Sequence, residues 1–566
     1  MPQVVLEEIP LDDDEGGEEV VTRRQGGESV SDAGERGSTD AGGKPVMVQK
    51  ADRDVVEYSR LPSCFKLSRC HPPVHYYGAF SMAGLSLAFL VNGALRSAAP
   101  TAFKALAKEF GLSASKLGTI PFFRNLVAAA VLPFCGYLSD RFSRRRIVTW
   151  SMLYLAILTT ALAFTTSYWS FLTIRTLSGL AFDFLLPISA SYIGDYYRRD
   201  KRGIAFAVIA VFATLGNLGG TMMMGSLASE SLMNTDGWRV VFVILGVASL
   251  ASAVSSWFLL FDPQRGTTEL EKPSDAEQRT EVGEEESEIR RIDLSQVKEI
   301  FHNMTLIVLM VCGTLYTIPW VGFNFLLYWF QLAGLTDVEA SATYGMAAVG
   351  FLLGNIGGGL CGDRVSKLNA VWAQDYGRIM VAQISLCIAL PLLTMLLVVF
   401  DGMESFPFFL IMTVVIAFFL SWPEQAADNP MLTESSHPDV RGTAIGLAFT
   451  VIGVLSSVGS LLVGVISEWY GFRELGPDED IADIPSADRD RNRDALAYSL
   501  LTVSLLFWGS QIIVYFVLYR LYPAQRDRIH AALREAENAV ELDIGELDIM
   551  ELGTGSMMRD ISQKDR

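Results

Sequence analysis

The architecture of this chain follows from one loop, Gly136-Tyr137-Leu138-Ser139-Asp140-Arg141-Phe142-Ser143-Arg144-Arg145-Arg146. It joins two apolar runs, from about residue 120 to 134 and from 147 to 164. A short loop with four arginines between apolar runs is expected to face the cytosol. Its acid–base pair falls at the membrane edge, where it can bridge helix ends and break when helices move. A plain positive-inside loop would explain the arginines, but we predict a gate formed by Gly136, Asp140, Arg141 and Arg144.

A similar loop returns about 220 residues later, as Gly359-Leu360-Cys361-Gly362-Asp363-Arg364. Both loops place a glycine four residues before an Asp-Arg pair. A second match joins Arg202-Gly203-Ile204-Ala205 to Arg441-Gly442-Thr443-Ala444, about 240 residues apart. Two matches in the same order indicate an internally repeated protein. A plain loop does not explain this repetition, so we assign gating roles to Asp363 and Arg364 as well.

The composition indicates a membrane protein. Of 566 residues, 50% are hydrophobic, and the mean hydropathy is +0.31, which soluble domains rarely reach. The net charge of −18 resides largely in the tails and polar loops, so it marks solvated segments. The chain has no basic domain for nucleic acid. Its six cysteines lack metal-ligand spacing, and we expect no metal and no cofactor.

About twelve apolar segments have spanning length. Basic loops on one side predict that both termini are cytosolic. We therefore expect an all-α membrane protein with twelve transmembrane helices in two six-helix halves. The segments centre near residues 90, 127, 157, 183, 214, 249, 318, 350, 390, 416, 454 and 508.

The polar segments divide the chain into five predicted regions. They are a disordered acidic cytosolic tail (1–75), an N-terminal six-helix bundle (76–262), a cytosolic inter-bundle loop (263–302), a C-terminal six-helix bundle (303–522) and a cytosolic C-terminal tail (523–566). Repeated halves of this kind place a substrate cavity at their interface, near the middle of the membrane.

Polar and ionisable residues inside the spans are candidates for function, because burying them in a bilayer is costly. Arg175 and Asp183 lie about 12 Å apart along one helix, so each needs a partner from another helix. Asp183 and Glu424 are candidate proton sites, with structural salt bridges as the alternative. The predicted substrate or coupling residues are Asn92, Arg96, Arg124, Asn125, Asp183, Asn217, Trp320, Asn324 and Glu424.

The repeated loops resemble the loop motif of the major facilitator superfamily. Arg175-Thr176-Leu177-Ser178-Gly179 and Gly237-Trp238-Arg239 resemble two further motifs of that family. The resemblance implies a gating or structural role for Arg175. Ile318-Pro319-Trp320 and the block from Asn355 to Arg364 resemble spinster-type members, which carry lysophospholipids or sphingolipid metabolites with protons. The spinster-type Asp-Arg pair of the first helix reads Leu95-Arg96 here, and the Glu of the fourth helix is Asp183.

The resulting prediction is a secondary active or facilitative transporter of a small organic or amphiphilic solute, and not an enzyme. A lipid carrier would line its cavity with aromatic side chains. A polar-metabolite carrier would line it with hydrogen-bonding groups, and a non-transporting receptor or scaffold is the third alternative. We expect a monomer in a plasma or endolysosomal or vacuolar membrane. Its partners would be the solute or lipid substrate, H⁺ and membrane lipids. The aromatic candidates are Phe122, Phe123, Trp320, Phe323, Phe325, Tyr328, Trp329 and Phe330.

Overall fold

The computed structural model describes residues 74–197, 199–232, 234–261, 302–368, 371–399, 405–436, 441–474 and 485–564. These residues belong to one compact unit, His71–Arg566. The predicted N-terminal tail, up to residue 73, and the inter-bundle loop, up to residue 301, lie outside the described residues. The five predicted region boundaries therefore stay predictions.

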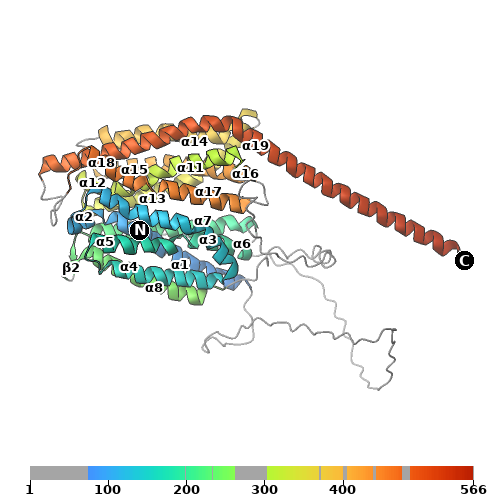
Figure 1. The fold of residues 1–566 in the computed structure, drawn as a ribbon, viewed down its shortest axis with the longest axis horizontal. Helices are drawn as coiled ribbons and strands as arrows, with labels where there is room; N and C mark the ends of the chain where they lie inside the picture. The colour runs from blue at the N-terminus through green and yellow to red at the C-terminus, as the bar shows by residue number, and fades with distance from the viewer. Residues whose placement is uncertain are drawn as a thin grey trace, which may run out of the picture. The chain divides into compact units, whose positions relative to one another are not determined.

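Among the described residues, the first half contains eight helices and a two-stranded hairpin (Figure 1). In the hairpin, Ser231 pairs with Asp236 and Leu232 with Thr235. The elements are α1 (Val74–Thr101), α2 (Phe103–Phe110), α3 (Ala114–Arg141), α4 (Arg144–Leu162), α5 (Tyr168–Phe182), α6 (Leu185–Tyr196), α7 (Arg199–Leu227), β1 (Ser231–Leu232), β2 (Thr235–Asp236) and α8 (Gly237–Leu259).

The second half has the same order of long helices, several of them interrupted by 3₁₀ or π turns. They are α11 (Met304–Gly322), η2 (Phe323–Phe325), α12 (Leu326–Leu332), α13 (Asp337–Ser366), α14 (Val371–Thr394), η3 (Met395–Val399), α15 (Phe406–Leu420), η4 (Pro423–Asp428), α16 (Asn429–Glu434), α17 (Arg441–Ser456), α18 (Gly459–Trp469) and α19 (Ser486–Lys564). The predicted C-terminal tail thus begins inside α19.

Eleven helical segments of the described residues are long and apolar enough to cross a membrane. They coincide with eleven of the twelve predicted spans. The twelfth predicted span corresponds to α4, which is helical but starts with Arg144, Arg145 and Arg146, and these arginines lower its hydropathy. The sequence-based count of about twelve helices therefore agrees with the structure.

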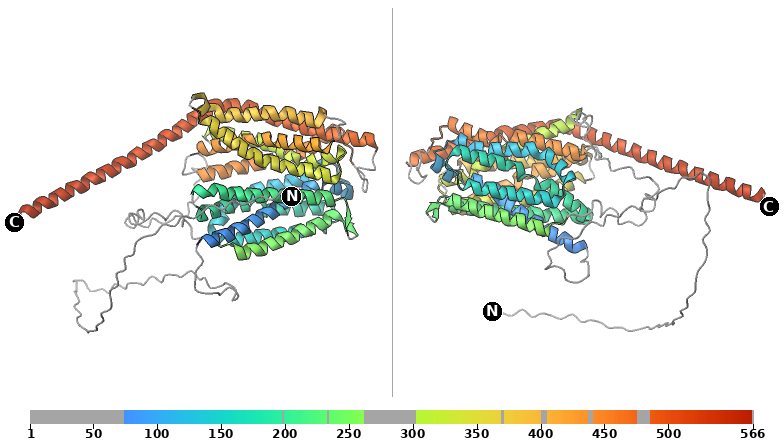
Figure 2. Two further views of the ribbon diagram at one scale, coloured as in Figure 1. Left: turned by 180° about the vertical axis from the view of Figure 1, so that it is seen from behind. Right: turned by 60° about the horizontal axis from the view of Figure 1, so that its bottom comes forward.

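The two halves repeat the same helix packing. In the first half α1 packs on α7, α3 on α5 and α4 on α8; in the second half α11 packs on α17, α13 on α15 and α14 on α19. The contacts between halves follow the same symmetry, because α7 packs on α13 while α3 packs on α17 and α18. Figures 1 and 2 show the blue-to-green helices beside the yellow-to-red ones.

Glycine allows the closest of these helix contacts. A Cβ atom on Gly216 of α7 would lie 1.9 Å from the carbonyl oxygen of Leu90 on α1. A Cβ atom on Gly93 of α1 would lie 2.3 Å from the carbonyl oxygen of Ala213 on α7. Backbones this close exclude any side chain, as in small-residue contacts between transmembrane helices.

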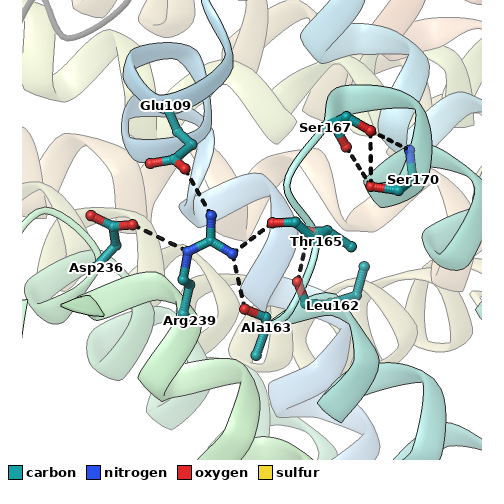
Figure 3. Close-up of polar contacts among 8 residues, drawn as sticks. All are labelled: Glu109, Leu162, Ala163, Thr165, Ser167, Ser170, Asp236 and Arg239. Atoms are coloured by element: carbon teal, nitrogen blue, oxygen red, sulfur yellow. Dashed lines mark hydrogen bonds and ion pairs between the residues drawn. The ribbon is translucent and has the colours of Figure 1, made fainter.

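Arg239, of the Gly237-Trp238-Arg239 motif, ties four segments together at one end of the first half (Figure 3). Its guanidinium contacts Glu109 of α2 at 2.7 Å and Asp236 of β2 at 3.1 Å. It also donates to the carbonyl oxygens of Ala163 and Thr165, at 2.9 and 2.6 Å. The planar guanidinium suits this arrangement because its five donors point in fixed directions.

Candidate functional site

A cavity of about 190 Å³ lies where the two halves meet. The first half contributes side chains of α1, α3 and α5, and the second half contributes α11 and η2. The cavity therefore stands where the repeated architecture predicts a substrate site. Its lining residues are Arg96, Ala99, Pro100, Ile120, Pro121, Arg124, Asn125, Arg175, Trp320, Val321 and Asn324.

Asp183 and Arg96 form an ion pair beside this cavity. The predicted fourth span is interrupted at Asp183, which caps the end of α5 before α6 begins at Leu185. The Asp183 carboxylate accepts from Nη2 of Arg96 on α1 at 2.7 Å. Arg175 donates to the carbonyl oxygen of Leu95, also on α1, at 3.2 Å. Both residues thus find partners on another helix, as their spacing predicted.

Arg124 adds a buried third guanidinium to the cluster. Its side chain is 7% exposed, and Nη1 donates to Oδ1 of Asn125 at 2.6 Å. Arg124 also interacts electrostatically with Asp183, Arg175 and Arg96. Three arginines and one acid therefore share this region of the described structure. With three guanidinium groups and one carboxylate, the formal charge of this cluster is positive.

The second half closes the cavity with Trp320 and Asn324. The Nδ2 atom of Asn324 donates to Oγ of Ser460 on α18 at 3.0 Å, and Ser460 in turn donates to the carbonyl oxygen of Val321 at 2.7 Å. The Trp320 ring lies 5.1 Å from Phe351 and 5.7 Å from Phe323. Trp320 therefore links the cavity wall to an aromatic cluster behind it.

Most of the other aromatic candidates pack inside the protein. Phe325, Tyr328 and Phe330 are fully buried, and Trp329 is nearly so. Among the eight candidates, only Trp320 lines the described cavity. The aromatic-rich end of the seventh span serves the hydrophobic core, which the spacing of its side chains alone could not reveal.

Besides Asp183, three of the predicted substrate or coupling residues lie outside the cavity lining. Asn92 is buried on α1, one turn before Arg96. Asn217 of α7 accepts from Oγ of Ser97 through its backbone carbonyl at 3.2 Å. Glu424 lies in the π turn η4, where its carboxylate accepts from Nδ2 of Asn429 at 3.5 Å. Glu424 therefore does not line the cavity that the three arginines share.

The predicted gate residues lie near the carboxyl ends of α3 and α13 and at the start of α4. Asp363 pairs with Arg378 of α14 at 2.9 Å, while Arg364 is exposed in the last turn of α13. Arg144 is buried, with its guanidinium 5.7 Å from the ring centre of Tyr192. Gly136 and the side chains of Asp140 and Arg141 lie outside the part of the structure whose surroundings are described. The gating roles of all these residues stay predictions.

A set of contacts that the sequence did not predict joins the two halves at the opposite end. Nζ of Lys104 lies 3.0 Å from both carboxylate oxygens of Asp337, at the start of α13. The backbone nitrogen of Ser115 donates to Glu468 at 2.9 Å, and Lys116 pairs with Glu474 at 3.4 Å. We name this the Lys104 end, and the opposite end the Asp363 end. About 39 Å of helical rise separates Asp337 from Asp363.

These features define a class: a multi-pass membrane protein made of two repeated helical halves with a polar cavity between them. The chain belongs to the Major Facilitator Superfamily, whose family profile matches residues 85–460. The predicted family and fold class are confirmed.

The chain is only distantly similar in sequence to individual proteins. The chain is 26% identical to the cis,cis-muconate transport protein of Acinetobacter baylyi, over 67% of this chain and 88% of that protein. It is 24% identical to a probable L-galactonate transporter of Escherichia coli, over 49% of this chain and 59% of that one. These relatives and the family indicate a membrane transporter rather than an enzyme.

Solved structures agree in fold. An inward-facing, unoccupied bacterial homolog of the human lysosomal transporter Spinster superposes with a TM-score of 0.63 at 18% identity, over 81% of this chain and 99% of that one. The nucleoside transporter NupG gives a TM-score of 0.52 at 17% identity, over 79% of this chain and 99% of that one. The fold therefore resembles spinster-like members.

Proposed function

We propose that the chain transports small organic anions, carboxylates above all, by alternating access between its two halves. The observation that carries this proposal is the cluster of Arg96, Arg124 and Arg175 around one carboxylate, Asp183. A solute with one or two carboxylates would balance the positive charge and accept the strong, charge-assisted hydrogen bonds that guanidinium groups donate.

The size of the cavity supports a small solute. At about 190 Å³ it is smaller than the roughly 300–1,000 Å³ of pockets that enclose drug-sized ligands. The names of two relatives are consistent with this class, since muconate and galactonate are both carboxylates. The protein would work as a monomer with both termini in the cytosol.

A lysophospholipid-like substrate shares part of this chemistry, because arginines also bind phosphate. The described cavity offers room for a head group, and most of the predicted aromatic wall is buried in packing. We therefore favour the polar metabolite over the lipid.

Uptake into proteoliposomes tests the proposal. We expect saturable uptake of labelled cis,cis-muconate, inhibited by galactonate. Arg124→Gln should reduce uptake about tenfold or more, because a hydrogen bond to a charged group contributes roughly 1.5–3 kcal/mol. The matched control is Arg520→Gln, which changes an exposed arginine of α19 outside the cavity lining. Uptake of lysophosphatidylglycerol without uptake of either carboxylate would overturn the proposal in favour of a lipid carrier.

A further inference from the structure

A second polar cluster lies inside the second half, outside the lining of the cavity that Arg96, Arg124 and Arg175 share. Its centre is η4, a π-helical turn of six residues that carries Glu424 near its start and Asp428 at its end. Asp428 is 8% exposed. Turns of this kind are rare and frequently occur at functional sites. Neither acid belongs to the lining of the arginine cavity.

Asp428 is held by side chains of α19. The hydroxyl of Tyr515 donates to its Oδ1 atom at 2.9 Å, and Nε2 of Gln511 lies 3.3 Å from its Oδ2 atom. Gln511 also donates to the Tyr515 hydroxyl at 2.9 Å, so the three groups form a closed network. Glu424 has the weaker contact with Asn429 already described.

In the described structure, the charged and titratable side chains near the pair come from α11 and α14 as well as from α19. From α11, Tyr316 donates to the carbonyl oxygen of Leu420 at 2.8 Å, and Cys312 and Tyr316 both interact electrostatically with Asp428. From α14, Arg378 donates to the carbonyl oxygen of Ala426 at 3.4 Å, while its ion pairs are with Asp363 of α13 and Glu434 of α16. Within the described residues, no basic side chain forms an ion pair with Glu424 or Asp428.

Two neighbouring carboxylates that have no ion pair among the described residues cannot both remain ionised at low cost in such surroundings. Burying one unpaired charge is expensive, and a second like charge one helical turn away adds repulsion. Sharing a proton removes both penalties. Tyr515 and Gln511 offer donors that stabilise one remaining negative charge.

We propose that Glu424 and Asp428 form a proton-binding site of the second half, separate from the anion cavity, and that this site couples proton movement to transport. Arg378 connects the site to the gate, because it holds both the backbone of η4 and Asp363. Loss of the proton would leave a second negative charge near Arg378, which would then compete with Asp363 for this guanidinium. A proton bound at the site therefore favours the ion pair between Arg378 and Asp363 at the Asp363 end.

Infrared difference spectroscopy of the full chain in liposomes, between low and high pH, tests the site without any substrate. We expect a protonated-carboxyl band that Asp428→Asn removes and Glu424→Gln removes or displaces. Both substitutions keep the side-chain shape and an acceptor oxygen. The matched controls Asp183→Asn, beside the anion cavity, and Asp490→Asn, in an exposed part of α19, should keep the band. A band that survives both Asp428→Asn and Glu424→Gln overturns the proposal.

The coupling role rests on the proposed anion transport and has its own test. With labelled cis,cis-muconate as the probe, an imposed pH gradient should drive accumulation by the wild-type protein. In Asp428→Asn, accumulation should fall to the level seen without a gradient, and Asp490→Asn should retain it. Retained gradient-driven accumulation in Asp428→Asn overturns the coupling role. Absence of wild-type muconate uptake would overturn the proposed function instead, while the infrared result still decides the proton site.

Discussion

The carboxylate of Asp183 has two opposing effects on the guanidinium of Arg96. The carboxylate stabilises a guanidinium inside a membrane protein, where an isolated charge is costly. In the proposed anion transport it would also compete with the incoming anion for the same donors. Because the two side chains are 55% and 27% exposed, breaking this ion pair has only a moderate cost. A fully buried pair would resist such an exchange.

This competition predicts the effect of Asp183→Asn on anion binding. Removing the negative charge should tighten the binding of cis,cis-muconate about 1.4- to 5-fold, since partly exposed ion pairs contribute roughly 0.2–1 kcal/mol. Calorimetry on the purified protein measures the change. Asp183→Glu keeps a carboxylate and serves as the matched control, with affinity close to that of the wild type. Weaker binding by the Asn variant would show that Asp183 helps to hold the ligand.

At the level of single elements, the close packing of α1 on α7 requires glycine at the position of contact. A glycine-rich sequence alone does not ensure it. Gly216 and Gly219 lie one turn apart on α7. Gly216 meets the backbone of α1, whereas a Cβ atom on Gly219 has nothing within 4 Å. A glycine-rich run does not reveal which of its glycines lies at a contact, and of these two only Gly216 does.

The two glycines therefore form a matched test of this contact. We expect Gly216→Ala to lower the apparent melting temperature in detergent by several degrees, because the new methyl group would overlap the Leu90 carbonyl and overpacking typically costs about 1–3 kcal/mol. Gly219→Ala should leave the melting temperature unchanged or raise it slightly, since alanine favours the helix. Equal effects of the two substitutions would contradict this contact.

For the molecule as a whole, the polar contacts described above hold the halves together at the Lys104 end. Lys104, Ser115 and Lys116 lie in the first half, and Asp337, Glu468 and Glu474 lie in the second. The rings of Phe103 and Phe325, 5.0 Å apart, add an apolar contact between the halves. Alternating access requires these contacts to break when the halves rock.

Weakening one of these contacts should shift the conformational equilibrium. In a chain with its native cysteines replaced, Val321→Cys places a thiol in the cavity lining. We expect Asp337→Asn to speed the labelling of this thiol by an impermeant reagent applied at the Lys104 end. Glu339→Gln is the matched control, because Glu339 caps the same helix through Thr336 and glutamine can replace it in that role. Unchanged labelling in Asp337→Asn would mean that this ion pair does not hold the end closed.

The sequence alone was sufficient to predict the membrane class and the two repeated halves. It was also sufficient to single out a set of intramembrane residues that includes all three arginines of the cavity. Hydropathy and repeated motifs are local properties, and an arginine in an apolar run is conspicuous wherever its side chain points. The same reasoning correctly required Arg175 and Asp183 to find partners on other helices.

Only the tertiary structure decided which partners these are. Asp183 and Arg96 are 87 positions apart in the sequence, as are Asp428 and Tyr515, and Lys104 is 233 positions from Asp337. Spacing along one helix determines which side chains share a face, but the neighbour that this face meets depends on how separate helices cross and are interrupted. For the same reason the aromatic residues after Trp320 suggested a cavity wall and instead pack in the core.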